Sequence, residues 1–508
     1  MSSITAIFID TISIQRYVFE SNKLIENVGA SYIVQSIYGP LLRESFNTLY
    51  KTQCVEHIVN KWKEPNNDKA IGDGDEFGIG YIGGGNALLF FRQENTAKEF
   101  VETWTKLLLC NAPGVQTAIA KGLFKENTFK DSYKALHEEL KVNKNKFHPI
   151  TLPYKFGITA DCPLSGHSSE VYYESNEEKK YISSYSFAKI SYFFAKINSK
   201  NKANEYLEDL RKDEIGEKLD FTTNINQLGQ TEGEDNYIAI VHIDGNKMGQ
   251  KFKDCESLLK LRQLSINTLS ATENAFKNLV KHIINLIENG VFKDVLILKQ
   301  SEDNKTFLPL RPIIIGGDDI TFVCDGRLGV YFAEKYIEIL KSEEHGYNAC
   351  AGICIVKTKH PFYRAYKLAE ELCRNSKKQS RDNNDVSCLD FYITSGDITG
   401  SLEDIRKKQS LFTYNSTDNE LTNGPYILEK EGTAHRKSIV NLKAGIKNLQ
   451  QNYSATKIME LRNAIISGKE KTYIVVEYIK PKLEKIDGDY KPYFDMIELK
   501  DFYPEVLL

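Results

Sequence analysis

Short apolar runs alternate with longer segments of helical periodicity along the first third of the chain. The runs have the length of strands and are rich in Ile, Val and Phe, whereas the longer segments place apolar residues three and four positions apart. The expected strands are residues 4–9, the two halves of 78–91, and 115–123; the expected helices end near Leu49 and cover 96–110 and 127–142. Strand, helix, strand, strand, helix, strand is the order of a ferredoxin-like unit.

The same order recurs in the second half of the chain, which predicts an internal duplication. The expected strands are 237–243, 313–315, 320–323 and 349–356, and the expected helices are 255–288, 329–341 and 361–378. The pattern therefore favours an α+β fold with two ferredoxin-like units. A length of 508 residues exceeds what one hydrophobic core serves and corresponds to about three or four domains.

The segments outside the two units have a more polar pattern with helical periodicity. The predicted domains are 1–157 and 236–396, which hold the two ferredoxin-like units, 158–235, a mostly helical middle domain that ends in a polar linker, and 397–508, a C-terminal helical bundle. Long helices are expected at 433–452 and 454–482 of the last domain.

The tip of the second predicted hairpin carries four residues, Gly316–Asp319, that packing does not require. The two glycines make a tight turn, and two adjacent aspartates follow. Adjacent carboxylates repel each other and are poor strand formers, so a divalent cation between them and another acid would stabilise them. Hard oxygen ligands suit Mg²⁺ or Mn²⁺. A solvated Gly-Asp turn is the alternative that this motif alone leaves open.

Asp244 is the partner acid, because it ends a predicted buried strand and is followed by a turn signal. An acid at the exit of one core strand and another on a later hairpin is the arrangement of palm-type nucleotidyltransferases and cyclases. There Asp244 and Asp318 would bind two metal ions about 4 Å apart, which clamp the attacking and leaving oxygens of an in-line displacement. Asp319 would be a further ligand or would orient the attacking hydroxyl, and the Gly245 carbonyl would add a ligand. His242 shares a strand face with Asp244, but a histidine in a core strand is expected to be simply hydrogen-bonded.

The first unit differs from the second at the corresponding positions. The turn that corresponds to Gly316–Asp319 reads Gly83-Gly84-Gly85-Asn86, and the strand acid Asp10 lacks an acidic hairpin partner. We therefore expect the first unit to be a degenerate, non-catalytic scaffold that can still hold a nucleotide.

Composition limits the classes of function. The net charge of −3 gives no global support for a free-standing nucleic-acid-binding protein, so any RNA contact must be local or shared with more basic partners. The nine cysteines are scattered without a C-x-x-C pair, which favours a reduced, cytoplasmic protein over a disulfide or structural zinc protein. The sequence predicts no signal peptide and no transmembrane helix, because no basic start or sufficiently long apolar stretch is present.

Four segments, taken in order, resemble the large subunit of type III CRISPR effector complexes, most closely the III-B kind. They are the opening of the first unit, SIQRYVFESNKLIENVGAS; the first strand of the second unit, IAIVHIDGNKMG; its hairpin, LPLRPIIIGGDDITFV; and its last strand and helix, AGICIVKTKHPFYRAYKLAEELCRNSKK. Each segment alone is moderately specific, and the resemblance covers nearly all of the chain.

The resemblance implies two palm domains packed face to face, with a middle and a C-terminal helical domain. It also implies that target RNA paired with the guide RNA of the complex activates the second palm, which converts ATP with Mg²⁺ or Mn²⁺ into a nucleotide messenger. That product would be a cyclic oligoadenylate, or AMP joined to S-adenosylmethionine. The other subunits of the ribonucleoprotein would be partners, and no membrane is expected.

On this resemblance the site residues fall into two groups. The catalytic and metal-binding residues are Asp244, Asp318 and Asp319, and the nucleotide-binding residues are Gly245, Gly316, Gly317 and Lys377. Gly316 and Gly317 let the backbone approach a ribose or phosphate without a Cβ clash. Lys377 stands where the family has a phosphate-binding lysine; a solvated basic helix end, favoured by the helix dipole, is the alternative.

The sequence departs from the family in two respects. The family often carries an N-terminal HD phosphohydrolase domain, but no His-Asp dipeptide occurs in this sequence, so we expect no HD nuclease activity. The family's middle domain often binds zinc through paired cysteines. The segment Asp161–His167 keeps Cys162 and His167 but lacks the second cysteine of a C-x-x-C. One Cys and one His do not complete a tetrahedral site, so zinc is not expected.

Two other functions stay open. The chain could be a structural platform for guide and target RNA with an idle palm, although clustered acids are costly to keep without a metal ion. It could instead be a stand-alone signalling cyclase, although such an enzyme has no need of the predicted C-terminal helical domain.

Overall fold

The structure, a computed structural model, describes residues 4–51, 55–146, 152, 157–174, 179–198, 218–229, 236–293, 295–394, 396, 400–409, 421–429 and 437–508. The chain divides into two compact units. The first consists of residues 1–206, 247–273 and 313–318, and the second of residues 207–246, 274–312 and 319–508.

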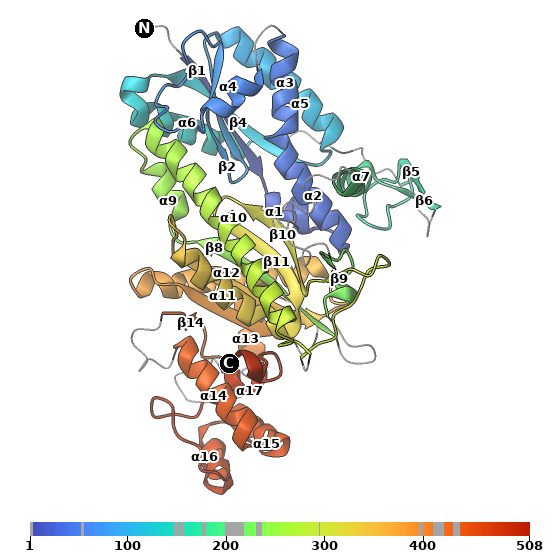
Figure 1. Cartoon of the computed structure of the whole chain (residues 1–508), viewed down its shortest axis with the longest axis vertical. Helices are drawn as coiled ribbons and strands as arrows, with labels where there is room; N and C mark the ends of the chain where they lie inside the picture. Colours follow the sequence, from blue (N-terminus) through green and yellow to red (C-terminus); the bar gives the residue numbers. More distant parts are fainter. Residues whose placement is uncertain are drawn as a thin grey trace. The chain divides into compact units, whose positions relative to one another are not determined.

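The core of the first unit is an antiparallel sheet with the strand order β2-β3-β1-β4, as the ferredoxin-like pattern predicts. Its strands are β1 (Ile4–Ile12), β2 (Phe77–Gly83), β3 (Asn86–Phe91) and β4 (Gln116–Phe124). Two helices, α5 (Glu94–Asn111) and α6 (Phe129–Lys144), pack on these strands (Figure 1, blue to cyan). The apolar spacing in α5 explains its packing, because Phe100, Trp104 and Leu108 form one buried stripe.

Further helices and a small hairpin belong to the first unit, which also includes residues 247–273 and 313–318. The connection from β1 to β2 contains α1 (Ile14–Phe19), α2 (Leu24–Ile37), α3 (Pro40–Leu49) and α4 (Val55–Lys61). Pro40 begins α3, where its missing N–H leaves no helical hydrogen bond unmade. The hairpin of β5 (Val171–Glu174) and β6 (Lys179–Ile182) precedes α7 (Ser184–Asn198), which packs on α2. The helix expected between residues 181 and 211 is present over α7, and residues 199–211 lie outside the described residues.

The core of the second unit is a sheet with the order β10-β11-β8-β12-β13-β14. Its strands are β8 (Tyr237–Gly245), β10 (Leu310–Gly316), β11 (Asp319–Asp325), β12 (Ala349–Lys357), β13 (Cys388–Ile393) and β14 (Tyr426–Ile427). The other elements between β8 and β13 are α9 (Met248–Lys253), α10 (Leu258–Glu288), β9 (Thr306–Phe307), α11 (Gly329–Ser342) and α12 (Phe362–Asp382). A short strand β7 (Leu219–Asp220) pairs with β9. The first four strands of the sheet repeat the order of the first unit.

The strand β13 was not among the expected strands, and its third residue is an acid, Asp390. In the structure this carboxylate is buried and neutralised. Arg406, on α13 (Leu402–Gln409), donates to both carboxylate oxygens at 2.8 and 2.9 Å, and Asn375 adds a third hydrogen bond at 2.8 Å. The buried charge of Asp390 is therefore paired by a residue outside the strand, which a buried carboxylate requires.

The C-terminal helices are α14 (Ile439–Asn452), α15 (Ala455–Ser467), α16 (Lys469–Tyr478) and α17 (Tyr493–Leu499). The expectation of one helix over 454–482 was wrong, because Gly468 adopts a φ of 116° and separates α15 from α16. Glu334 of α11 accepts hydrogen bonds from Lys443 at 3.0 Å and from Tyr503 at 2.8 Å, which attaches this region to the second sheet. None of the described helices is both long and apolar enough to cross a bilayer.

Candidate active site

The turn between β10 and β11 consists of Gly317 and Asp318. Gly317 has a φ of 61°, which favours glycine, and its carbonyl accepts a hydrogen bond from the Thr272 hydroxyl at 2.7 Å. A Cβ on Gly317 would also lie 3.2 Å from the Cα of Gly84. A Cβ on Gly316 would meet nothing within 4 Å. The fold therefore requires glycine at 317, and any requirement at 316 must come from a ligand.

Three potential metal ligands gather where β8 and β11 pair. Asp319 lies directly opposite Asp244, and His242, two residues before Asp244, lies on the same face of β8 because side chains alternate along a strand. One ligand atom from each of these side chains lies within 4.8 Å of the others. Carboxylates directly opposite each other in a sheet repel, so a cation between them would stabilise the pair.

His242 is buried and held by its neighbours. Its Nδ1 lies 3.0 Å from the hydroxyl oxygen of Thr321, the opposite residue on β11, and its ring meets that of Tyr366 edge-on at 5.7 Å. Burial lowers the pKa of His242 to about 4, against the influence of Asp244 and together with that of Lys377. The imidazole is therefore neutral near pH 7, and it is hydrogen-bonded as the strand pattern predicts.

Lys377 reaches the end of β8 from α12. Its ammonium lies 2.5 Å from a carboxylate oxygen of Asp244 and donates to the Gly245 carbonyl at 2.9 Å. Both charged side chains are partly buried, with exposed fractions of 20% for Lys377 and 29% for Asp244. The lysine thus contacts two groups that the sequence predicts as metal ligands. A metal ion that binds these oxygens must displace the ammonium or share them with it.

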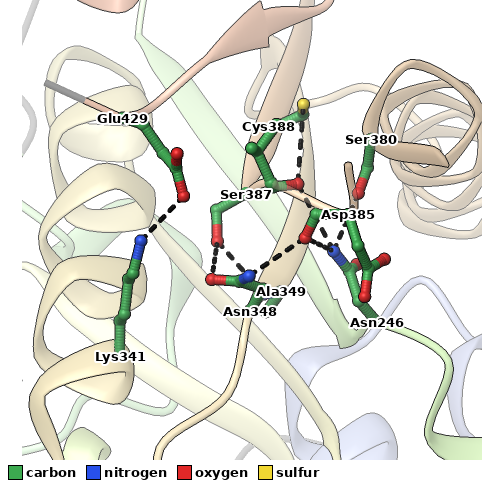
Figure 2. Close-up of polar contacts among 10 residues, drawn as sticks. Asn246, Lys341, Asn348, Ala349, Ser380, Asp385, Ser387, Cys388 and Glu429 are labelled. Atoms are coloured by element: carbon green, nitrogen blue, oxygen red, sulfur yellow. Dashed lines mark hydrogen bonds and ion pairs between the residues drawn. The ribbon is translucent and has the colours of Figure 1, made fainter. Parts of the chain in front are cut away.

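A hydrogen-bond network fixes the residue that follows this site (Figure 2). The Asn246 side chain is buried and donates to the Ser380 hydroxyl at 2.8 Å and to the Asp385 carbonyl at 3.3 Å, and its backbone N–H donates to the Asn348 carbonyl at 2.8 Å. Asn348 itself donates to the Asp385 carbonyl at 3.0 Å. The network joins the exit of β8 to the loop after α12, which fixes the backbone at Gly245.

The first unit carries a related but altered arrangement. Asp10 lies opposite Asn86 in the pairing of β1 with β3, so an amide occupies the position that Asp319 has in the second sheet. Lys144 lies 2.5 Å from a carboxylate oxygen of Asp10. Lys144 also stands at the same offset from the start of α6 as Lys377 does from the start of α12. The acid and lysine pair is therefore repeated, whereas the second acid is not.

A cavity of about 790 Å³ opens beside Asp10 in the first unit. Its wall combines aromatic rings with charged side chains: Phe8, Tyr81, Tyr133, His137 and Phe252, the five lysines Lys130, Lys134, Lys141, Lys144 and Lys253, and the four acids Asp10, Glu138, Asp254 and Asp318. Burial raises the pKa of Asp10, although Lys144 opposes this. The glycines Gly83, Gly84 and Gly317 also line the cavity.

The site residues predicted from the sequence lie in two different places in the structure. Asp244, Asp319, Gly245 and Lys377 meet at the end of β8. Asp318 lines the cavity of the first unit and does not belong to the group of three potential ligands. Sequence reasoning missed the supporting residues, which are Asn246, Thr321 and Tyr366. Thr321 could have been found from the strand alternation, which places it on the same face of β11 as Asp319, whereas no local signal indicates the other two.

Residues 237–387 match the family model described as Cas10/Cmr2, second palm domain. This segment contains β8, the hairpin of β10 and β11, β12 and α12, and therefore every candidate residue of the acidic site. No curated protein matches the chain.

Solved structures of a Csm1–Csm4 cassette are similar to the chain over nearly its whole length. The cassette in complex with AMPPNP has a TM-score of 0.52 at 11% identity, over 99% of this chain and 70% of that chain. The complex with cA3 has a TM-score of 0.52 at 11% identity, over 99% and 69% of the two chains, and the apo cassette has 0.50 at 12%, over 99% and 70%. At such identities the likeness establishes the fold. The chain therefore has a Csm1-like α+β fold, in which residues 237–387 match the second palm domain of Cas10/Cmr2.

Proposed function

We propose that this protein is a metal-dependent nucleotidyltransferase of a type III CRISPR effector complex, which converts ATP into a 3′-5′ linked nucleotide messenger when target RNA pairs with the guide. The match of residues 237–387 to a Cas10/Cmr2 palm supports the class of protein. The similar cassette structures contain AMPPNP and cA3, which supports ATP as the substrate and a cyclic oligoadenylate as the product. AMP joined to S-adenosylmethionine is the alternative product.

The observation that carries the proposal is the direct opposition of Asp244 and Asp319 on neighbouring strands. Like charges at opposed positions destabilise a sheet. Lys377 contacts Asp244 at 2.5 Å. Its single positive charge does not balance the two negative charges of Asp244 and Asp319, so a cation would stabilise the pair further. Mg²⁺ or Mn²⁺ suits this set of oxygens, and Asp318, the residue before Asp319, is our ligand for a second ion.

In the proposed reaction the 3′-hydroxyl of one ATP attacks the α-phosphate of another, and pyrophosphate leaves. Positioning and charge neutralisation supply most of the catalysis in such transfers. Asp244, Asp318 and Asp319 would hold the metal ions, which would supply positive charge for the triphosphate. The ammonium of Lys377 would contact the phosphates. Gly316 lets the backbone approach the nucleotide.

The cavity of the first unit is our site for the second nucleotide. Its volume of about 790 Å³ lies in the range of roughly 300–1,000 Å³ that is typical of small-molecule sites. Aromatic rings such as Tyr81 and Phe252 offer stacking surfaces for a base, and lysines such as Lys141 and Lys253 offer charge for phosphates. Asp10, already paired with Lys144, has no acidic partner opposite it and is not proposed to hold a metal ion.

The proposed partners are the other subunits of a type III complex, together with guide and target RNA. The match to a cassette of Csm1 with Csm4 supports a protein partner of that kind. The III-B subtype is proposed from the sequence resemblance alone. A net charge of −3 agrees with an RNA-binding surface that is shared with other subunits.

The test uses the tagged protein purified from its host with its partners. The complex receives matching target RNA, ATP, S-adenosylmethionine and Mn²⁺, and the products are identified by mass spectrometry. We expect an RNA-dependent adenylate product that is abolished in Asp318→Ala/Asp319→Ala and in Asp244→Asn. Asp303→Asn, an exposed acid before β9, is the matched control and should retain full turnover.

The outcomes separate the functions that the sequence leaves open. Full turnover in the Asp318/Asp319 double variant, with the complex intact, contradicts the site. A wild-type complex that assembles and binds target RNA without any product favours the structural platform. Product formation by the chain alone, without RNA or partners, favours the stand-alone cyclase.

A further inference from the structure

Four short polar side chains from two separate segments meet in the middle region of the first unit. Cys162 and Ser165 lie on one turn, and Ser183 and Ser186 lie at the N-terminus of α7. Each pair is separated by two residues. Two such pairs on two segments have the spacing of a C-x-x-C and C-x-x-C zinc site in which three of the four positions are serine.

Hydrogen bonds connect all four residues into one cluster. The hydroxyl oxygens of Ser165 and Ser183 lie 2.9 Å apart, and the Cys162 sulfur lies 3.9 Å from the Ser186 hydroxyl oxygen. The backbone N–H of Ser186 donates to the Ser183 hydroxyl at 3.2 Å. Cys162, Ser183 and Ser186 are each at most 2% exposed. The four groups therefore converge on one buried point.

The surroundings of the Cys162 sulfur favour the thiolate form. Burial opposes ionisation, but hydrogen bonds from the Ser165 hydroxyl and from the backbone N–H groups of Ser183, Leu164 and Ser165 outweigh it and lower the pKa of Cys162 to about 7. The turn itself is closed by Gly166, which donates to the Cys162 carbonyl at 2.8 Å. Among the described residues, Cys162 belongs to no group of three or more potential metal ligands.

The donor set does not fit a structural zinc ion. Such sites use four thiolate or imidazole ligands, and neutral hydroxyls are not among them. His167, the other residue that the sequence suggested, places its ring against that of Tyr185 at 5.1 Å. The zinc that the family resemblance implies for the middle domain therefore disagrees with the residues of this chain.

We propose that the cluster of Cys162, Ser165, Ser183 and Ser186 is a former zinc site in which a hydrogen-bonded set of hydroxyls and one thiol now fastens the turn to α7. This connection between the turn and α7 helps to hold the first unit together, because α7 packs on α2. The same helix also carries Lys189, which is buried against the rings of Tyr17 and Tyr185 at 4.4 and 3.7 Å. A metal ion is no longer needed to hold this part of the first unit together.

The proposal predicts that three substitutions restore metal binding. In the full-length chain with Ser165→Cys, Ser183→Cys and Ser186→Cys, the four sulfurs should bind Zn²⁺. We expect one equivalent of zinc per chain beyond the wild-type content, measured by elemental analysis after dialysis. Co²⁺ in its place should give the visible absorption of tetrahedral thiolate coordination. Adding Cys162→Ser to the triple variant should weaken binding and change that spectrum.

The wild-type chain provides the second arm. Its zinc content should equal that of Cys162→Ser, and its thermal midpoint should be the same in EDTA and in added zinc. A wild-type chain that keeps one equivalent of zinc, lost in Cys162→Ser or accompanied by a drop of the midpoint in EDTA, overturns the proposal. A folded triple variant that binds no more zinc than wild type overturns it as well. If the triple variant does not fold, the wild-type arm alone decides.

Discussion

Replacing Lys377 with methionine should change metal binding and catalysis in opposite directions. The ammonium of Lys377 lies 2.5 Å from Asp244 and 2.9 Å from the Gly245 carbonyl, so it competes with a metal ion for both oxygens. Methionine keeps much of the length and apolar volume of the side chain but carries no charge. The metal ion then no longer has to displace an ion pair.

The magnitude follows from the partial burial of the pair. Exposed ion pairs contribute about 0.2–1 kcal/mol, and burial of both side chains moves this pair to the upper end, about 1 kcal/mol. Because 1.4 kcal/mol is tenfold in an equilibrium constant, we expect the Mn²⁺ dissociation constant of Lys377→Met to fall about fivefold. The lost contact with the triphosphate, a charge-assisted hydrogen bond worth about 1.5–3 kcal/mol, should lower turnover by about 10- to 150-fold.

Mn²⁺ binding is measured by electron paramagnetic resonance of the free ion during titration of the purified chain. Lys378→Met is the matched control, because it removes the same charge one residue further along α12 from an exposed side chain. Its Mn²⁺ affinity should change less than twofold. If Lys377→Met binds Mn²⁺ no more tightly than Lys378→Met, the competition inferred for Lys377 is wrong.

Two further predictions concern the glycine turn and the wall of the cavity. Gly317→Ala should lower the thermal midpoint, because φ is positive at this residue and the new Cβ would lie 3.2 Å from the Cα of Gly84, a strain of about 1–2 kcal/mol. Gly316→Ala should leave the thermal midpoint unchanged, because its Cβ would meet nothing within 4 Å. The turnover of Gly316→Ala then reports how closely a nucleotide approaches the backbone. A Gly316→Ala variant that unfolds early would contradict this distinction. Burial, followed by the charges of Lys253 and Lys144, lowers the pKa of His137 to about 4, below the 6.5 of an unfolded chain. The unfolded chain therefore takes up a proton at a higher pH than the folded chain does. The stability of the fold is greatest above about pH 6.5 and decreases as the pH falls towards 4. Proton linkage at His137 lowers the free energy of unfolding by at most about 2 kcal/mol between pH 7 and pH 5, and partial exposure reduces this to about 1 kcal/mol. The thermal midpoint of His137→Phe should therefore fall less over that interval than the midpoint of the wild type. An equal fall would refute the neutral state of His137.

Local pattern was sufficient for the elements that surround the candidate site. Apolar runs of strand length bounded by glycine and aspartate predicted β8 and the hairpin of β10 and β11, and helical spacing predicted α12. The repeated order of elements also predicted the same strand order in both sheets. These inferences succeed because hydrophobic periodicity and turn chemistry are properties of neighbouring residues.

Tertiary structure decided which side chains meet. The register of β11 against β8 places Asp319, rather than Asp318, opposite Asp244, and a shift by one residue would reverse every side chain on that strand. The contact of Lys377 with Asp244 likewise depends on how α12 packs on the sheet.

The sequence by itself thus determined the type of unit, the position of the acidic turn and the candidate residues on it. Only the tertiary structure decided the partners of Asp10 and Asp244, the network around Asn246 and the meeting of Cys162 with serines from α7. The physical reason is that these contacts join segments far apart in the chain. Their distances depend on strand register and helix packing, which the spacing of residues within any one segment does not encode.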